Sequence, residues 1–330
     1  MTISGIYHHD LILIWHTLAM DSSLYNFAIS LIDPKMRLVA GRRLLGGVSA
    51  DVFLLQVKDH QGYRAQWVLR QNKKADTQTA ASIAILREFE LAQALYRQGF
   101  CVPEPLAVCL DTTEFGEPFW VMAFISGSTD LGDGDLRARL EAMAEALVQI
   151  HKAPISALKK LPNRTNPIPE LYDYLPSGAL WSQLRRLLSD NRFCEYSGTP
   201  SLLHGDFWAG NLIWDQDQLV GILDWEDAAI GDPMCDLATA RLEILWKFDD
   251  ATAQQFTKHY AQRLPIDRWR LALWQVFVGS AALKFMGDWG LDAKVVNRME
   301  RCSKTFIESS AQQVVTMDPE TEPSTQLPAF

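Results

Sequence analysis

A short polar segment between apolar runs constrains the fold and chemistry of this chain more than any other feature. It reads LHGDFWAGN at residues 203–211, so Asp206 stands five residues before Asn211, and Asp224 ends the next apolar run. One carboxylate in such a set can reach a hydroxyl proton, while an amide and a second carboxylate can hold Mg²⁺ through oxygen. The pattern predicts that the three residues share one site. The alternative is a turn followed by an ordinary carboxylate at a strand end.

Length and charge narrow the class of protein. The 330 residues are 48% hydrophobic and 22% charged, as in globular proteins. That length fits about two domains of roughly 150 residues each. The chain has 31 basic and 40 acidic residues, a formal net charge of −9. This balance argues against a nucleic-acid partner, which usually requires a basic surplus, but it allows a local nucleotide pocket.

Cysteine spacing and hydropathy indicate the cellular compartment of the chain. The five cysteines are odd in number, widely spaced and without a Cys-x-x-Cys pair. A disulfide framework or zinc cluster is therefore not expected, and a reducing compartment fits. The apolar stretch at residues 11–15 is far shorter than the ~20 residues of a membrane span. We expect a cytoplasmic protein with no membrane partner and no signal peptide.

Apolar periodicity predicts different architectures for the two halves of the chain. In the first half we expect a mostly antiparallel sheet with one inserted helix at 80–98, and strands at 51–57, 65–70, 106–110 and 119–125. The second half is predicted to be mostly helical, with short strands near 202–204, 211–214 and 219–224. The fold class is therefore α+β with two lobes. The expected divisions are a helical extension at 1–40, lobes at 41–126 and 127–315, and a mobile tail at 316–330.

A family resemblance emerges once the motifs are taken together. The string H-G-D-x-x-x-x-N at 204–211, the triplet D-W-E at 224–226 and G-D-P-x-x-D-L-A at 231–238 form one set. This set resembles the catalytic and metal-binding loops of aminoglycoside phosphotransferases and related small-molecule kinases, such as choline kinase. The resemblance covers residues 40–300. It implies a protein kinase-like fold, with a nucleotide-binding lobe at 41–126 and a catalytic and substrate lobe at 127–315.

The resemblance also implies roles for residues of the second half. Asp206 would be the catalytic base or the carboxylate that orients the substrate. Asn211 and Asp224 would be the Mg²⁺ ligands. His204 would support the loop, and Asp236 would anchor it from the following helix.

In the first half, the resemblance implies two backbone contacts with the nucleotide. Gly46, Gly47 and Ser49 stand where a phosphate-covering loop would lie. Glycines there let backbone N–H groups approach the phosphates, and the serine adds a donor. The segment between the lobes would read adenine through backbone groups of Ala123 and Ile125.

Arg70 is a departure from the family pattern. It occupies the position of the strand lysine that contacts the α- and β-phosphates, with Glu88 on the long helix as the expected partner and Glu90 as the rival. A guanidinium remains a phosphate binder and can grip two oxygens at once. We therefore do not interpret the substitution as loss of activity.

The expected activity is that of a small-molecule kinase. Only residues 225–230 separate Asp224 from Gly231, so no long activation segment is present to dock a peptide. The sequence thus favours a phosphotransferase that uses ATP or GTP with Mg²⁺ and phosphorylates a hydroxyl of an aminoglycoside, amino alcohol, sugar or similar molecule. Two alternatives remain open: a nucleotide-binding pseudokinase with a scaffolding role, and a hydrolase whose metal binds His204, Asp206 and Asp224. The oligomeric state is not indicated.

Overall fold

The described residues form two units. The computed structural model describes residues 22–44, 50–72, 77–111, 113, 116–156, 158, 161–189 and 195–317. The N-terminal unit holds the described residues up to Ser128 together with Val220–Glu226. The C-terminal unit holds Thr129–Leu219 and the described residues from Asp227 onward. The predicted boundaries of the extension, lobes and tail stay predictions.

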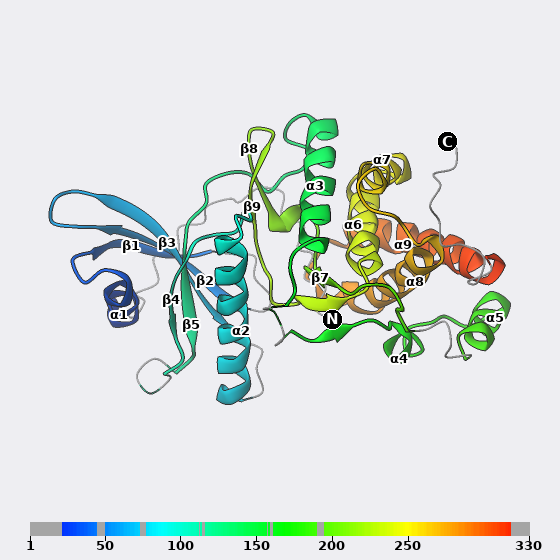
Figure 1. Cartoon of the computed structure of the whole chain (residues 1–330), viewed down its shortest axis with the longest axis horizontal. Helices are drawn as coiled ribbons and strands as arrows, with labels where there is room; N and C mark the ends of the chain where they lie inside the picture. Colours follow the sequence, from blue (N-terminus) through cyan, green and yellow to red (C-terminus); the bar gives the residue numbers. More distant parts are fainter. Residues whose placement is uncertain are drawn as a thin grey trace. The chain divides into compact units, whose positions relative to one another are not determined.

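A five-stranded antiparallel sheet is the framework of the N-terminal unit (Figure 1). Its strands lie in the order β1-β2-β3-β5-β4, and every neighbouring pair is antiparallel. One helix, α2 (Gln78–Arg97), is inserted after β3. The strands are β1 (Arg37–Leu44), β2 (Ala50–Lys58), β3 (Arg64–Asn72), β4 (Pro105–Cys109) and β5 (Phe119–Ala123). The predicted antiparallel sheet with an inserted helix is confirmed.

Helix α2 packs on one face of this sheet. It begins after Thr77, whose hydroxyl accepts a hydrogen bond from the backbone N–H of Ala80 at 3.1 Å. Such a cap satisfies one of the N–H groups that a helix start leaves unpaired. The buried side of the helix contacts sheet residues Leu54, Val68 and Trp120. Glu88 lies on this buried side, which places a carboxylate at the sheet instead of in solvent.

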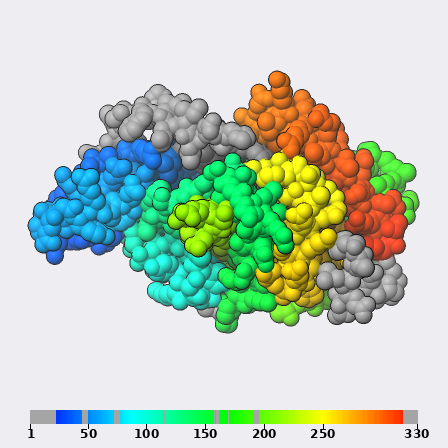
Figure 2. All heavy atoms as spheres, turned by 90° about the horizontal axis from the view of Figure 1, so that it is seen from above, coloured from blue at the N-terminus to red at the C-terminus, as the bar shows by residue number. Residues whose placement is uncertain are grey.

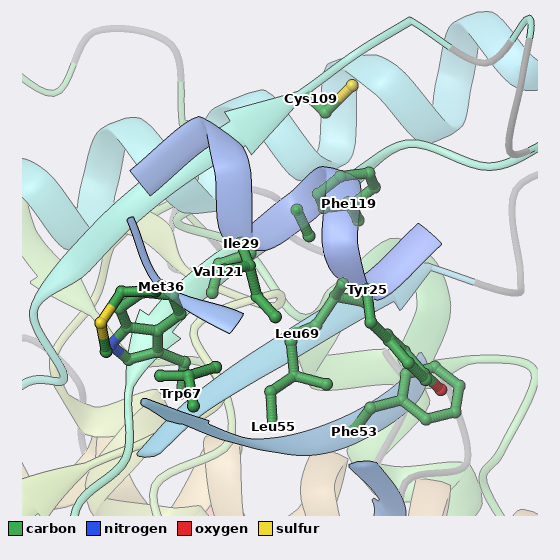
Figure 3. Close-up of a cluster of buried hydrophobic side chains, with 12 residues drawn as sticks. Tyr25, Ile29, Met36, Phe53, Leu55, Trp67, Leu69, Cys109, Phe119 and Val121 are labelled. Atoms are coloured by element: carbon green, nitrogen blue, oxygen red, sulfur yellow. The ribbon is translucent and has the colours of Figure 1, made fainter. Parts of the chain in front are cut away.

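The opposite face of the sheet is covered by α1 (Ser22–Ile32), as Figure 3 shows. Tyr25 and Ile29 of this helix pack with Phe53 and Leu55 of β2. Successive strand residues point to opposite faces, so Leu54 reaches the α2 side. Burial on both faces explains the unbroken apolar run in β2, which a sheet with one wet face would not need. Helix α1 lies within the stretch expected to be a helical extension, and residues 1–21 lie outside the described part.

Strand β1 is a strand of the N-terminal unit that the sequence does not predict. It lies within and just after the stretch expected to be a helical extension. Its side chains are mostly exposed, because it is an edge strand that pairs with β2 through backbone groups. A strand held mainly by its backbone carries little apolar alternation, which is the signal that sequence reasoning uses.

The C-terminal unit is mostly helical, as predicted. A three-stranded sheet in the order β6-β10-β7 accompanies the helices. Strand β8 pairs with β9, which begins in this unit and continues from Val220 as part of the N-terminal unit. The helices are α3 (Leu136–His151), α4 (Ile168–Leu171), α5 (Ala179–Leu188), α6 (Met234–Lys247), α7 (Asp250–Ala261), α8 (Arg268–Phe285) and α9 (Ala293–Thr316). The strands are β6 (Asn163–Arg164), β7 (Ser201–Leu203), β8 (Leu212–Asp215), β9 (Gln218–Ile222) and β10 (Ala229–Gly231). The short 3₁₀-helices are η2 (Ala209–Asn211) and η3 (Met286–Asp288).

The core of this unit forms around α8, which packs against α6 and α9. Its Trp274 donates a hydrogen bond from Nε1 to Asp232 Oδ2 at 2.6 Å, and Arg270 Nε donates to the same oxygen at 2.6 Å. These bonds fix Asp232, which precedes the N-cap residue Pro233 of α6. On another side of α6, α7 lies next to α3, and the two helices appear side by side in the space-filling view (Figure 2). No helix of the described part is long and apolar enough to cross a bilayer.

Candidate functional site

The polar segment after β7 folds into a tight, buried loop. Asn211 donates two hydrogen bonds from Nδ2, one to the backbone oxygen of Asp206 at 2.9 Å and one to its Oδ2 at 3.1 Å. Both residues are buried, with exposed fractions of 8% and 4%. Oδ1 of Asn211 accepts no hydrogen bond from the described residues. The amide nitrogen of Asn211 therefore holds the Asp206 carboxylate in place, and the amide oxygen of Asn211 stays available for a ligand.

Asp236, on the first turn of α6, holds the backbone of this loop. Its Oδ2 accepts the N–H of His204 at 2.7 Å, and its Oδ1 accepts the N–H of Gly205 at 2.9 Å. Burial would raise the pKa of this carboxyl, but hydrogen bonds from His151 and Gly205 and the nearby His204 lower it below its ordinary value. An ionised, fully buried acceptor thus anchors the two residues that precede Asp206.

Glycine is required at position 205. Its φ is +88°, in the left-handed region that side chains rarely adopt. A Cβ built there would also lie 2.1 Å from the backbone oxygen of Asp227, an impossible approach. The close passage of these two backbone segments is therefore the physical reason for the glycine in H-G-D.

His151 and Tyr260 extend the anchor away from the loop. His151 ends α3, and its Nε2 lies 3.3 Å from Asp236 Oδ2. Its Nδ1 lies 2.8 Å from the hydroxyl of Tyr260 on α7. The sequence analysis does not identify either residue. A histidine at the end of an amphipathic helix and a tyrosine 109 residues later carry no local signal, because their partners come from other elements.

In the N-terminal unit, Arg70 is the centre of a charged cluster. From β3 it donates through Nε to Glu88 Oε2 at 3.1 Å. Its Nη2 donates to Asp224 Oδ1 at 3.1 Å and to Glu226 Oε2 at 2.7 Å. The predicted partner on α2, Glu88, is thus the one that contacts the guanidinium. Glu226 is an additional partner, which the sequence marks only by its place next to Asp224.

Burial and charge act against each other in this cluster. Burial alone would lower the pKa of Arg70, but the carboxylates of Glu88, Asp224 and Glu226 raise it above the ordinary value. Burial raises the pKa of Glu88, and Arg70 offsets this only in part. One guanidinium faces three carboxylates, so the fully ionised cluster carries a charge of −2. It attracts a cation and would repel a free triphosphate.

Asp224 has an unusual backbone. Its φ is +60°, and Gln216 is the only other non-glycine residue of the described part with a positive φ. Such conformations are strained and persist only where the surroundings enforce them, often at functional sites. Asp224 belongs to the N-terminal unit, whereas Asp206 and Asn211 belong to the C-terminal unit. Their expected meeting at one site therefore stays a prediction.

The segment expected to read adenine has one free donor. The N–H of Ala123 donates to the backbone oxygen of Glu104 at 2.9 Å, and that of Phe124 donates to Gln66 at 3.0 Å. The N–H of Ile125 donates to no described residue. Of the two predicted positions, Ile125 therefore offers its N–H to a ligand, whereas the N–H of Ala123 is already bonded.

Other predicted positions are the glycine-rich segment and His204. Gly46, Gly47 and Ser49 fall outside the described residues. Among the residues that the structure describes, no cluster of three or more His, Cys, Asp or Glu side chains is arranged to hold a metal. His204 takes part in the loop, where its Nδ1 accepts the N–H of Asp206 at 3.3 Å.

Comparison with known proteins identifies the family. The model of the family described as "Phosphotransferase enzyme family" matches residues 40–274, well over half of the chain. The chain belongs to this phosphotransferase family. The predicted resemblance to aminoglycoside phosphotransferases is thereby confirmed.

Solved structures support the same fold for this family member. A GDP complex of a mutant aminoglycoside 2′-phosphotransferase-IIIa has a TM-score of 0.62 at 20% identity and covers 88% of this chain and 100% of that one. The streptomycin–ATP complex of APH(2″)-IIa has a TM-score of 0.56 at 20% identity and covers 80% and 90%. At this identity the likeness shows the fold, which is the kinase-like fold of the aminoglycoside phosphotransferases.

The curated relatives are long proteins, and this phosphotransferase family member matches only a part of each. Acyl-CoA dehydrogenase family member 11 of Homo sapiens is 29% identical over 224 residues, which cover 61% of this chain and 27% of that protein. Family member 10 of Mus musculus is 26% identical over 284 residues, covering 72% and 25%. The match spans about a quarter of each relative, so their names do not assign an activity to this chain.

Proposed function

We propose that this chain is a phosphotransferase that uses Mg²⁺ and ATP, or GTP, to phosphorylate a hydroxyl of a small molecule. The observation that carries the proposal is the buried contact of Arg70 with both Glu88 and Asp224. It joins the proposed phosphate-binding cation, its helix partner and a proposed metal ligand in a single unit. The nucleotide complexes of the structural neighbours, with ATP or GDP, support the choice of cofactor.

The donor set fits magnesium. Mg²⁺ prefers oxygen and is usually held by one or two carboxylates together with substrate phosphates. Asn211 offers Oδ1, and Asp224 offers a carboxylate in a cluster of charge −2. When bound, the metal would neutralise charge on the transferred phosphoryl group. Arg70 would add a permanent cation that can grip phosphate oxygens once they replace its carboxylate partners.

Asp206 is the proposed residue for the acceptor. Its carboxylate is fixed by Asn211 and its backbone position by the bonds of Asp236 to the two preceding residues. A carboxylate held in this way can accept the proton of a substrate hydroxyl and orient its oxygen toward phosphorus. Catalysis then rests mainly on positioning and charge neutralisation, as is general for phosphoryl transfer.

The acceptor class follows from the short connection between Asp224 and Gly231, which leaves no segment to dock a protein. Structural neighbours were solved with kanamycin or streptomycin, both hydroxylated small molecules. An aminoglycoside, amino alcohol or sugar remains the proposed acceptor, and no nucleic acid or membrane is proposed as a partner. The cytoplasm is the proposed location. Free thiols at Cys101, Cys109, Cys235 and Cys302 support it.

The decisive experiment is a ligand screen followed by a transfer assay. Thermal shift with ADP and Mg²⁺ present would rank hydroxylated metabolites and antibiotics, because ligands that bind the native state raise its melting temperature. Hits would then be incubated with γ-labelled ATP or GTP. Transfer of label to a hit supports the proposal. Tight binding of Mg·ATP with no transfer to any hit and no hydrolysis would contradict it.

A nucleotide-binding pseudokinase is the second candidate. The observation that favours it is the contact of the Arg70 guanidinium with three carboxylates. If this cluster only stabilises the N-terminal unit, Arg70 has no part in phosphate binding. Substitutions of Arg70 separate the two functions.

A further inference from the structure

A buried hydrogen-bond chain leads from α7 to the proposed catalytic loop. It runs from the hydroxyl of Tyr260 through the His151 ring to Asp236, and from there to the backbone N–H groups of His204 and Gly205. The side chains of His151 and Asp236 are fully buried, and the exposed fraction of Tyr260 is 0%. Water therefore cannot substitute for a lost partner at low cost, and each bond constrains the next.

The direction of each bond follows from the chemistry of the groups. Asp236 is ionised and can only accept, so the Nε2 of His151 must carry the proton that faces it. In the neutral ring, Nδ1 then has a lone pair and accepts the hydroxyl proton of Tyr260. Burial raises the pKa of Tyr260 well above its ordinary value, so the phenol keeps this proton. In this arrangement each hydrogen bond of the chain has one donor and one acceptor.

We propose that His151 and Tyr260 are positioning residues for phosphoryl transfer. Tyr260 holds the ring so that Nε2–H faces Asp236, and Asp236 then holds the backbone that carries Asp206. The inference rests on the proposed function for its catalytic consequence. Its structural part, the control of the loop by α3 and α7, stands independently of any substrate.

Aromatic packing adds to the constraint. The rings of His151 and Tyr260 meet edge to face, with centroids 5.7 Å apart and planes inclined by 75°. Replacing Tyr260 by Phe keeps this packing and removes only the hydroxyl. The Nδ1 acceptor is then left buried and unpaired, which costs free energy and allows the ring to turn away from Asp236. Tyr260→Phe is therefore a clean test of the hydroxyl.

The first experiment needs no substrate. Amide hydrogen exchange would be measured in the apo chain for the peptide that contains His204 and Gly205. We expect Tyr260→Phe to speed exchange at these two amides by about five- to tenfold, the effect of one weakened hydrogen bond. The matched control is Tyr25→Phe, which removes the hydroxyl of an equally buried tyrosine in the N-terminal unit. Equal exchange in wild type and Tyr260→Phe overturns the proposal.

A spectroscopic experiment tests the direction of the bonds. The seven histidines can be labelled with ¹⁵N, and the His151 signal assigned by its loss in His151→Gln. We expect a proton on Nε2 of this ring. A proton on Nδ1 alone in the wild type would overturn the assignment, because Asp236 would then face a lone pair.

A substitution series tests the catalytic consequence. The side-chain amide of Gln reaches the place of Nε2 and can still donate to Asp236. That of Asn reaches only the place of Nδ1, and Phe offers no donor. With an acceptor from the screen, we expect kcat to fall about ten- to a hundredfold in His151→Asn and His151→Phe, with the KM for nucleotide nearly unchanged. His151→Gln should recover most of the loss.

The outcomes separate this inference from the proposed function. Faster exchange in Tyr260→Phe together with the ranking of Gln above Asn and Phe supports both. If exchange responds but no acceptor is ever phosphorylated, the proposed function fails and the control of the loop stands. If kcat falls equally in all three His151 variants, in proportion to lost folded protein, the residue is only structural and the proposal is overturned.

Discussion

Arg70 Nη2 donates a hydrogen bond to Asp224 Oδ1 at 3.1 Å, joining residues that stand 154 positions apart in the chain. The contact places the arginine that stands where the family usually has a lysine against a proposed metal ligand. Nucleotide phosphates that approach this guanidinium meet the carboxylates bound to its Nε and Nη2. The strength of phosphate binding is therefore coupled to the charge at Asp224 and Glu226.

Substitutions of Arg70 test its contact with phosphate. Arg70→Lys should keep measurable activity with weaker nucleotide affinity, because the charge stays but the bidentate fork is lost. Arg70→Ala should lose far more affinity, since the cluster then presents three uncompensated carboxylates to the triphosphate. Melting temperature and Mg·ATP affinity would be measured on both variants. Equal ATP affinity in wild type and Arg70→Ala, corrected for folded fraction, would falsify the phosphate contact and favour the pseudokinase.

Asp224→Ala tests the metal site. We expect it to abolish Mg²⁺-dependent nucleotide binding while the chain stays folded, because the variant removes a carboxylate proposed to hold the metal. Isothermal calorimetry with ATP, with and without Mg²⁺, measures the effect. Asp227→Asn is the control, since it removes a nearby charge outside the Arg70 cluster. An unchanged Mg·ATP affinity in Asp224→Ala would exclude this ligand.

Asp206→Asn tests the acceptor carboxylate. The amide keeps the size of the side chain but cannot take a proton. Turnover with an acceptor from the screen should fall roughly 10²–10⁴-fold, the usual range for a lost general base. The affinity for Mg·ATP should stay within about a factor of two of the wild type, because Asp206 is proposed to contact the acceptor and not the nucleotide. Near-normal turnover would remove Asp206 from this role.

The Asp236→Asn variant tests how the contribution of this carboxylate to the stability of the folded chain depends on pH. The folded-state pKa of this carboxyl is lowered, so its contribution is fully present above the ordinary pKa of 3.8 and is lost as pH falls through the folded value. At neutral pH the variant should be less stable by about 3 kcal/mol, because two backbone donors lose an ionised acceptor. Urea unfolding across pH 3–7 should show this difference shrinking below about pH 4. A difference that is constant over this range would contradict the assignment.

Local signals explain what the sequence could predict. The apolar residues of the inserted helix recur at helical spacing, and the structure has this helix at Gln78–Arg97, close to the predicted 80–98. The partnership of Arg70 with Glu88 comes from the family resemblance, and the structure has this contact. The helix needed only local residues, whereas the partnership needed the family pattern.

Tertiary partnership explains what the sequence could not predict. β1 is stabilised by its backbone pairing with β2, which leaves no apolar pattern to detect. Tyr260 is a tyrosine on a polar-looking helix, and nothing local shows that its hydroxyl meets His151, 109 residues away. Glu226 stands beside Asp224 in the sequence, yet only the fold shows that both carboxylates point to one guanidinium.

The seven residues Val220–Glu226 have a consequence for dissecting this protein. They belong to the N-terminal unit although the chain on either side of them belongs to the other unit. A fragment that ends at Ser128 would keep Arg70 and Glu88 but lose the carboxylates of Asp224 and Glu226. It would also lose the bond from the N–H of Ile222 to the backbone oxygen of Cys101, 2.6 Å long. Cutting the chain at one position therefore cannot release either unit intact. A chimera that takes the N-terminal unit from a relative would also have to take that relative's counterpart of residues 220–226.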